Sequence, residues 1–164
     1  MVTVAPTRTV QDLTTLFNHA GHVLSTRLTV ALAGIGLTPR MQCVLQNALE
    51  GERTQIQLAE LAHLDKTTMV MTIDELESAG YARRELSSTD RRARVIVVTE
   101  DGARIASAGQ KIVDQVHSEA LAELEEQDRK TFLCALTQLV EDHLAMPLDC
   151  DRPVRRARTA RRRV

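Results

Sequence analysis

The chain has 164 residues, of which 43% are hydrophobic and 26% charged, with 21 basic against 22 acidic side chains. This length predicts one domain with enough chain to bury a core, and the composition excludes a disordered or fibrous protein. No apolar run approaches the roughly 18 residues that a membrane-spanning helix needs, and residues 1–9 lack the order of a signal peptide. We therefore expect a soluble, cytoplasmic protein with no membrane partner.

The first third of the chain predicts two helices. Apolar side chains recur at three- and four-residue steps over residues 10–35, which indicates an amphipathic helix. Thr38 and Pro39 then have the properties of an N-cap and of proline at the first helical position. The second helix would end at Gly51.

A helix-turn-helix is expected next. Thr54 predicts the N-cap of a short helix that ends at Ala62, and Asp65 predicts the N-cap of a helix over residues 66–79. The inward stripe of that second helix consists of Met69, Ile73 and Leu76. Two short helices joined by about four residues match the helix-turn-helix spacing.

The periodicity then changes to that of strands. Residues 81–86 and 94–98 predict a β-hairpin with a polar connection that projects from the body. Thr99 would cap a helix over residues 100–124, and a last helix is expected over 126–145. This order predicts a mainly α fold with a small β-hairpin, namely a winged helix-turn-helix flanked by a helical dimerisation module.

We treat residues 1–164 as a single domain. Residues 38–99 form the winged helix-turn-helix, residues 10–37 and 100–146 the dimerisation module, and residues 147–164 a basic tail. The apolar stripes of 10–35, 105–124 and 132–144 are more than the small winged helix can cover, so they predict a homodimer.

Four stretches within residues 54–102 resemble the MarR family of multiple-antibiotic-resistance regulators. They are Thr54-Gln-Ile-Gln-Leu-Ala-Glu-Leu-Ala62, Asp65-Lys-Thr-Thr68, Asp74-Glu-Leu-Glu-Ser-Ala-Gly80 and Asp90-Arg-Arg-Ala-Arg-Val-Ile-Val-Val-Thr-Glu-Asp-Gly102. The last is similar to the family's wing motif, in which Asp-x-Arg leads through a strand to Thr-x-x-Gly. The resemblance implies a homodimeric repressor that binds double-stranded DNA at a near-palindromic operator and is released by a ligand.

Expected DNA contacts lie at the starts of two helices and in the hairpin: Thr54, Gln55, Lys66, Thr67, Thr68, Met71, Arg83, Asp90, Arg91, Arg92 and Arg94. The positive end of the helix at Lys66 suits base edges and phosphates. The resemblance places Arg92 in the minor groove, where a narrow groove concentrates negative potential, and Asp90 would hold the wing through a charge-assisted hydrogen bond. Met71 and Glu75 replace basic residues common in the family, so contact should be confined to the first two helical turns.

The resemblance also implies an effector pocket lined by the first two helices and the start of the fifth. The matching positions are His19, His22, Arg27, Met41 and Cys43. A small aromatic or lipophilic acid could pair there with Arg27 or with a histidine.

Other chemistry is not indicated. The five histidines (His19, His22, His63, His117 and His143) form no HxxxH or HExxH pattern, and the three cysteines (Cys43, Cys134 and Cys150) have no CxxC spacing. We expect surface or structural histidines, Cys43 as a small core residue, and no metal, cofactor or disulfide. No catalytic motif is present, so an enzyme is not expected.

Two interpretations remain open. The tail over residues 152–164 has seven arginines and no acid, while residues 1–151 hold the other 14 basic residues and all 22 acidic ones, a net charge of −8. The tail could bind DNA nonspecifically or only keep the chain solvated. Asp74, Glu75 and Glu77 favour the alternative function, a winged-helix module that binds proteins and not specific DNA.

Overall fold

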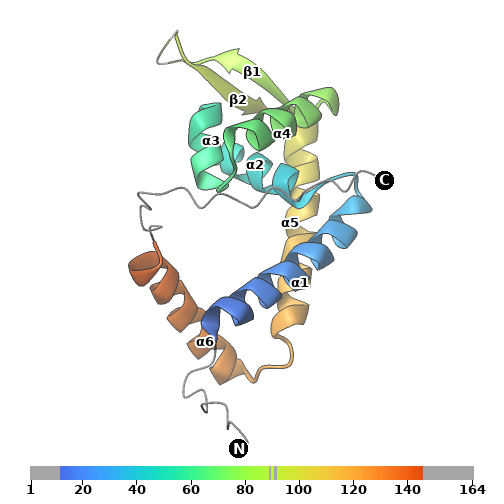
Figure 1. Ribbon diagram of the computed structural model, residues 1–164. Helices are drawn as coiled ribbons and strands as arrows, with labels where there is room; N and C mark the ends of the chain where they lie inside the picture. The colour runs from blue at the N-terminus through green and yellow to red at the C-terminus, as the bar shows by residue number, and fades with distance from the viewer. Residues whose placement is uncertain (1–11, 89, 91, 146–164) are drawn as a thin grey trace, which may run out of the picture. The chain divides into compact units, whose positions relative to one another are not determined.

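The computed structural model describes residues 12–88, 90 and 92–145, and the chain divides into two compact units, Met1–Ala122 and Glu123–Val164. The first unit contains α1 (Leu13–Ala33), α2 (Pro39–Leu49), α3 (Gln55–Leu61), α4 (Lys66–Ser78), β1 (Ala82–Leu86), β2 (Arg94–Val98) and α5 (Glu100–Leu121) (Figure 1). The second contains α6 (Glu126–Gln138) and the π-helical turn η1 (Leu139–His143). The expected mainly α fold with one hairpin is confirmed.

The helices begin at the N-caps that the sequence predicts. The Thr38 hydroxyl accepts from the backbone N–H of Met41 at 3.2 Å, and the Thr99 hydroxyl accepts from that of Gly102 at 3.0 Å. After α4 the chain turns at Gly80, whose φ of 75° is readily adopted only by glycine.

The core of the first unit lies where α2 and α4 meet the hairpin and the start of α5. The expected stripe of α4 is fully buried there, at Met69, Ile73 and Leu76. It packs with the other buried side chains of the cluster: Leu32, Leu37, Met41, Val44, Leu45, Ala48, Leu58, Ala82, Ile96 and Ala106. This core is almost wholly aliphatic, in keeping with an aromatic content of only 2% in the chain.

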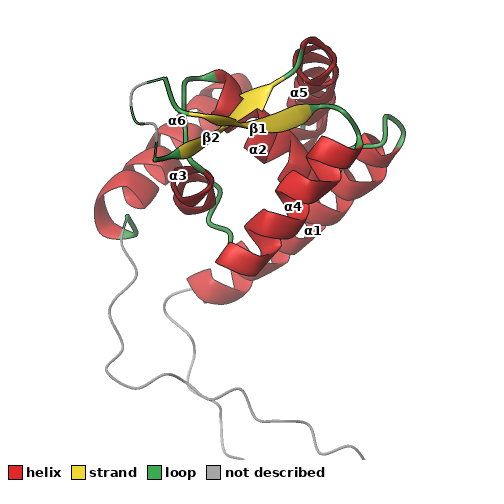
Figure 2. Ribbon diagram, turned by 90° about the horizontal axis from the view of Figure 1, so that it is seen from above, coloured by secondary structure: helices red, strands yellow, loops and turns green. Residues whose placement is uncertain are grey.

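The hairpin is tied to the helices along both strands. Antiparallel pairing sets Arg84 opposite Ile96, and the Ile96 backbone N–H donates outside the hairpin to the Arg53 carbonyl at 3.0 Å. A single bridge also joins Thr54 to Val95. As Figure 2 shows, β2 lies beside α2 and α3 while β1 lies beside α4. The wing is therefore continuous with the helix-turn-helix.

The Thr-x-x-Gly part of the wing motif closes the junction of the hairpin with α5. Thr99 donates through its hydroxyl to the Gly80 carbonyl at 2.8 Å and through its backbone N–H to the Tyr81 carbonyl at 3.0 Å. A Cβ on Gly102 would lie only 1.9 Å from that same Tyr81 oxygen. Only glycine therefore allows α5 to start so close to β1.

Two expectations about the long helices differ from the structure. The apolar stripe over 105–124 predicts Ile105, Ile112 and Val116 on the inward side. Instead, the buried side of α5 consists mainly of small residues, Gly102, Ala106 and Gly109 with Val116, while Ile105 and Ile112 are only half-buried. Small residues are favoured because α2 approaches so closely that a Cβ on Gly109 would lie 2.1 Å from Gln42 Oε1. The expected helix over 126–145 is α-helical only to Gln138 and then becomes the π-helical turn.

Cys43 is also not the core residue that the sequence suggests. It is half-buried, because its side of α2 faces a cavity instead of the central cluster. Among the described residues, no helix combines the length and the apolar character needed to cross a membrane.

Candidate nucleic-acid interface

The N-terminal end of α4 is built around the Asp65 side chain. Its Oδ1 accepts from the backbone N–H groups of Thr67 and Thr68, both at 3.0 Å, and its Oδ2 accepts from the Thr68 hydroxyl at 2.6 Å. These bonds hold the pKa of Asp65 below its usual value of 3.8, and the bond from the Thr68 hydroxyl has the largest effect on it. Because Asp65 is ionised and committed to the cap, the exposed Lys66 and Thr67 side chains are the groups left to face a ligand.

Further along α4, Met71 points away from the core. Its side chain is 55% exposed, whereas the neighbouring Val70 is half-buried and Met69 is fully buried. Met71 therefore continues the outward face that Lys66 and Thr67 begin, and it adds an apolar contact group to a polar surface.

The start of α3 is fixed by a reciprocal pair of hydrogen bonds. The Gln57 backbone N–H donates to the Thr54 hydroxyl at 3.3 Å, and the Thr54 backbone N–H donates to Gln57 Oε1 at 2.8 Å. This capping box uses the Thr54 side chain locally, while Gln55 is half-buried beside it. The two residues expected to contact DNA here are thus held rigidly at a helix start.

Asp90 organises the described part of the wing turn. Its Oδ1 accepts from the Arg92 backbone N–H at 2.9 Å, and its carbonyl accepts from the Ala93 N–H at 2.9 Å. Its own N–H donates to the Ser87 hydroxyl at 3.1 Å. Arg92 is exposed, so the turn presents a guanidinium from a backbone that Asp90 holds. Arg91 lies outside the described residues.

The other predicted arginines of the hairpin differ from one another. Arg83 forms an ion pair with Glu85 on its own strand, which partly compensates its charge. Arg94 is exposed at the start of β2, directly opposite Leu86. Arg94 is thus the strand arginine closest in sequence to the wing turn.

Arg84, which we did not expect at the interface, points toward α4. Its Nη2 donates to Asp74 Oδ1 at 2.7 Å, its Nη1 pairs with Glu77 Oε2, and its backbone N–H donates to Glu77 Oε1 at 2.8 Å. Two of the three acidic residues that favour a protein-binding surface are therefore paired within the domain, and Glu75 is exposed. The alternation of β1 was the only sequence signal for this arrangement.

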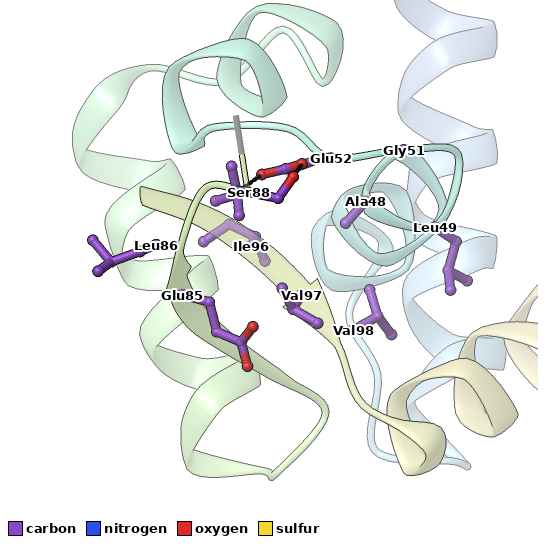
Figure 3. A pocket seen from close by; sticks show the side chains of 11 residues that line it. Ala48, Leu49, Gly51, Glu52, Glu85, Leu86, Ser88, Ile96, Val97 and Val98 are labelled. Atoms are coloured by element: carbon purple, nitrogen blue, oxygen red, sulfur yellow. Dashed lines mark hydrogen bonds between the residues drawn. The ribbon is translucent and has the colours of Figure 1, made fainter. Parts of the chain in front are cut away.

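Glu52 anchors the wing from the loop between α2 and α3. Its two carboxylate oxygens accept from the Ser88 backbone N–H at 2.8 Å and from the Ser88 hydroxyl at 2.7 Å (Figure 3). Hydrogen bonds from Ser87 and Ser88 hold the pKa of Glu52 below its usual value of 4.5. Glu52 and Ser88 also line a shallow cavity of about 430 Å³, whose apolar side chains include Leu49 and Leu86.

A separate cavity of about 240 Å³ lies between α1, α2 and α5. Its lining is mostly apolar, and its polar side chains are all uncharged. The lining residues are Leu28, Leu32, Pro39, Gln42, Cys43, Gln46, Asn47, Gln110 and Val113. Burial raises the pKa of the Cys43 thiol despite a hydrogen bond from Asn47 that acts in the opposite direction. Cys43 is therefore a thiol at neutral pH and a poor nucleophile.

The structure does not bring the five predicted effector residues together. Cys43 lines the cavity, but Met41 is buried in the core, and His19 and His22 are exposed on α1. Arg27 lines another cavity, of about 480 Å³, between α1 and α5. These residues are separated because they lie on different faces of α1 and α2.

The basic tail, over residues 152–164, lies outside the described residues. Its two interpretations therefore stay as the sequence leaves them. Within the described residues, no three His, Cys, Asp or Glu side chains are grouped so as to hold a metal ion.

A helix-turn-helix joined to a hairpin with an arginine in its turn, and then to a long helix, defines a winged helix-turn-helix protein. Residues 36–93 match the model of the MarR family. CouR from Rhodococcus jostii RHA1, solved with p-coumaroyl-CoA, is 26% identical over 86% of this chain and 96% of that one, with a TM-score of 0.72. A MarR-family transcriptional regulator from Rhodococcus sp. RHA1 is 26% identical over 79% and 96%, with a TM-score of 0.70.

A CouR repressor solved with a 23-mer DNA duplex shares the fold at 22% identity, over 85% of this chain and 99% of that one, with a TM-score of 0.70. Together, the family match over residues 36–93 and the similar structures support the assignment of this chain to the MarR family of transcriptional regulators.

Proposed function

We propose that this protein is a homodimeric repressor that binds a near-palindromic DNA site and is released by a small ligand. The carrying observation is the wing turn, in which the Asp90 carboxylate holds the Arg92 backbone and leaves the Arg92 side chain exposed. The cap at Asp65 likewise frees Lys66 and Thr67 at the start of α4. A rigid backbone with free basic and hydroxyl side chains is what major- and minor-groove contacts require.

The homodimer is supported by apolar side chains that a single chain leaves exposed. In the second unit, exposed fractions range from 43% to 56% at Phe132, Leu133, Val140 and Leu144. In the first unit, Leu13, Leu16 and Phe17 of α1 are exposed by 41–55%. A second copy of the chain would remove these surfaces from water, and two-fold symmetry is the commonest way of doing so.

Two-fold symmetry sets the operator geometry. Two copies of α4 would enter successive major grooves about 34–36 Å apart, with each Arg92 in a flanking minor groove. Such an arrangement requires half-sites related by near-palindromy. The 23-mer duplex bound by a CouR repressor of the same fold is long enough for two such half-sites.

The effector would occupy the cavity between α1, α2 and α5. Its volume of about 240 Å³ suits a small aromatic or lipophilic group, and its described lining contains no charged side chain. An acid bound there would thus keep its carboxylate outside the cavity, since a buried unpaired charge is costly. The p-coumaroyl-CoA bound to the similar CouR likewise combines an aromatic end with a charged carrier.

The alternative function, a protein-binding module without specific DNA binding, has less support. It depends on the acidic residues of α4, and Arg84 already pairs with Asp74 and Glu77. Only Glu75 of the three is left exposed without an ion pair among the described residues.

The decisive experiment selects duplexes from a random-sequence pool and measures their affinity by fluorescence anisotropy. Arg92→Ala should weaken binding to the selected duplex by about 1–3 kcal/mol per contact, with two contacts per dimer. Asp90→Ala should weaken it as well, although it makes the wing more positive, because the turn loses its brace. Arg104→Ala removes an exposed arginine of α5 and serves as the matched control.

Three results would reject the proposal. The pool could yield no preferred duplex, Arg92→Ala could lose no more affinity than Arg104→Ala, or Asp90→Ala could bind as tightly as the parent. The first result would favour the protein-binding alternative.

A further inference from the structure

Arg84 connects the hairpin to α4, the proposed DNA-recognition helix, through three hydrogen bonds. Its guanidinium reaches Asp74 with Nη2 and Glu77 with Nη1, and its backbone N–H reaches the second Glu77 oxygen. Each carboxylate oxygen of Glu77 thus accepts from Arg84. Because both the backbone N–H and the guanidinium of one residue donate these bonds, they fix the distance between β1 and α4 and the orientation of one relative to the other.

The pairing is more protected than an ordinary surface ion pair. The Arg84 side chain is 23% exposed and that of Glu77 31%, while Asp74 is 56% exposed. Partial burial reduces screening by salt, and the planar guanidinium fits two acceptors at once, which a lysine ammonium does not.

Arg84 also compensates the negative charge of two carboxylates on α4. Asp74 and Glu77 lie three residues apart on α4, so without a cation they would repel each other. They would also add negative charge to the helix that is proposed to approach phosphates. One guanidinium between them limits both effects.

The neighbouring arginine shows the contrast. Strand alternation directs Arg83 to the other face of the hairpin, where its partner is Glu85 and its side chain is 58% exposed. Arg83 pairs with Glu85 through Nε and is well exposed, so its Nη atoms can approach a phosphate, whereas both Nη atoms of Arg84 are held by carboxylates.

We propose that Arg84 is a positioning residue for DNA binding, which sets the wing against α4 through Asp74 and Glu77 and does not itself touch DNA. This inference rests on the proposed function. It predicts that simultaneous binding of the recognition helix and the wing depends on the Arg84 pairings, although neither pairing faces the operator.

The test measures three variants against the selected duplex and a random duplex. Arg84→Gln should lower the affinity for the selected duplex by roughly tenfold, which is the size of the coupling found within one ion-pair network. Its affinity for the random duplex should change much less, because nonspecific binding depends on phosphate contacts. In an Asp74→Asn/Glu77→Gln background, Arg84→Gln should cause no further loss, because its partners are already gone.

The salt dependence separates positioning from direct phosphate binding. Arg84→Gln should leave the log–log salt slope unchanged, whereas Arg83→Gln should lower its magnitude by roughly 0.9 for each phosphate that is no longer neutralised. A loss of folded protein would reduce both duplex affinities equally, and urea denaturation of each variant checks this. If Arg84→Gln does not fold, Arg84→Lys carries the same test, because it keeps the charge but cannot bridge both carboxylates.

The inference is overturned if Arg84→Gln binds the selected duplex like the parent, if its loss is the same in the amide background, or if its salt slope falls as for a phosphate contact. A parent protein that selects no duplex would instead overturn the proposed function. The two failures are therefore distinguishable.

Discussion

Replacing Gly102 with alanine should destabilise the winged helix, because the new Cβ has no space. It would lie 1.9 Å from the Tyr81 carbonyl oxygen and 2.8 Å from Val98 Cγ1. The Tyr81 oxygen also accepts the Thr99 backbone N–H at 3.0 Å, so it cannot retreat without weakening that bond. Relief of the clash therefore requires the start of α5 to move away from the hairpin.

The expected loss follows from two opposing effects. Overpacking of this kind costs about 1–3 kcal/mol, and the clash is with backbone instead of a flexible side-chain end. The higher helix propensity of alanine returns at most about 1 kcal/mol. We expect a net loss of about 1–2 kcal/mol in the free energy of unfolding, measured from urea denaturation at fixed protein concentration.

Gly51→Ala is the matched control. No atom lies within 4 Å of its added Cβ, and its φ is not positive, so alanine is tolerated. Reduced freedom of the unfolded chain should stabilise this variant by about 0.4–1 kcal/mol. If Gly102→Ala shifts the urea midpoint in the same direction as Gly51→Ala, the close approach of α5 to Tyr81 does not hold and the role given to this glycine is wrong.

Three further predictions concern the wing, the dimer and the tail. Hydrogen bonds from Ser87 and Ser88 lower the pKa of Glu52, so they contribute stability above the usual value of 4.5 that is lost as pH falls through the lower folded pKa. Glu52→Gln should flatten the acid dependence of unfolding in that range, and an unchanged acid profile would contradict the anchor. Phe132→Asp should give a monomer in light scattering at micromolar concentration, while Leu49→Asp, at a similarly exposed apolar position of the first unit, should stay dimeric; monomeric parent protein would exclude the homodimer. Deleting residues 152–164 should lower the magnitude of the salt slope, by roughly 0.9 per phosphate contact, without changing which duplex is selected; an unchanged slope would mean that the tail is only solvated.

The features that the sequence predicts well are those decided within a few residues. The N-caps at Thr38, Thr54, Asp65 and Thr99 each depend on a side chain and a backbone N–H two or three positions further on. The buried stripe of α4 likewise follows from helical periodicity alone. Short-range geometry leaves few alternatives, so residue type and spacing are enough.

The features that the sequence does not predict join distant segments. Glu52 and Ser88 are 36 positions apart, and neither has a local pattern that marks it as an anchor. The closely packed side of α5 is not predicted for another reason. Periodicity weighs large apolar residues, while this helix packs through Gly102, Ala106 and Gly109. How closely two helices approach is decided by both surfaces together, which one segment of sequence does not contain.

The effector cavity and the wing share a hydrogen-bonded connection through the end of α2. Asn47 lines the cavity, and its main-chain and side-chain carbonyl oxygens accept from Arg53 Nη1 at 2.7 and 3.2 Å. The Arg53 carbonyl in turn accepts the backbone N–H of Ile96 in β2 at 3.0 Å. Under the proposed function, a ligand that displaces Asn47 would disturb its bonds to Arg53, the residue whose carbonyl holds β2, and would thereby loosen a support of the wing on which DNA binding depends.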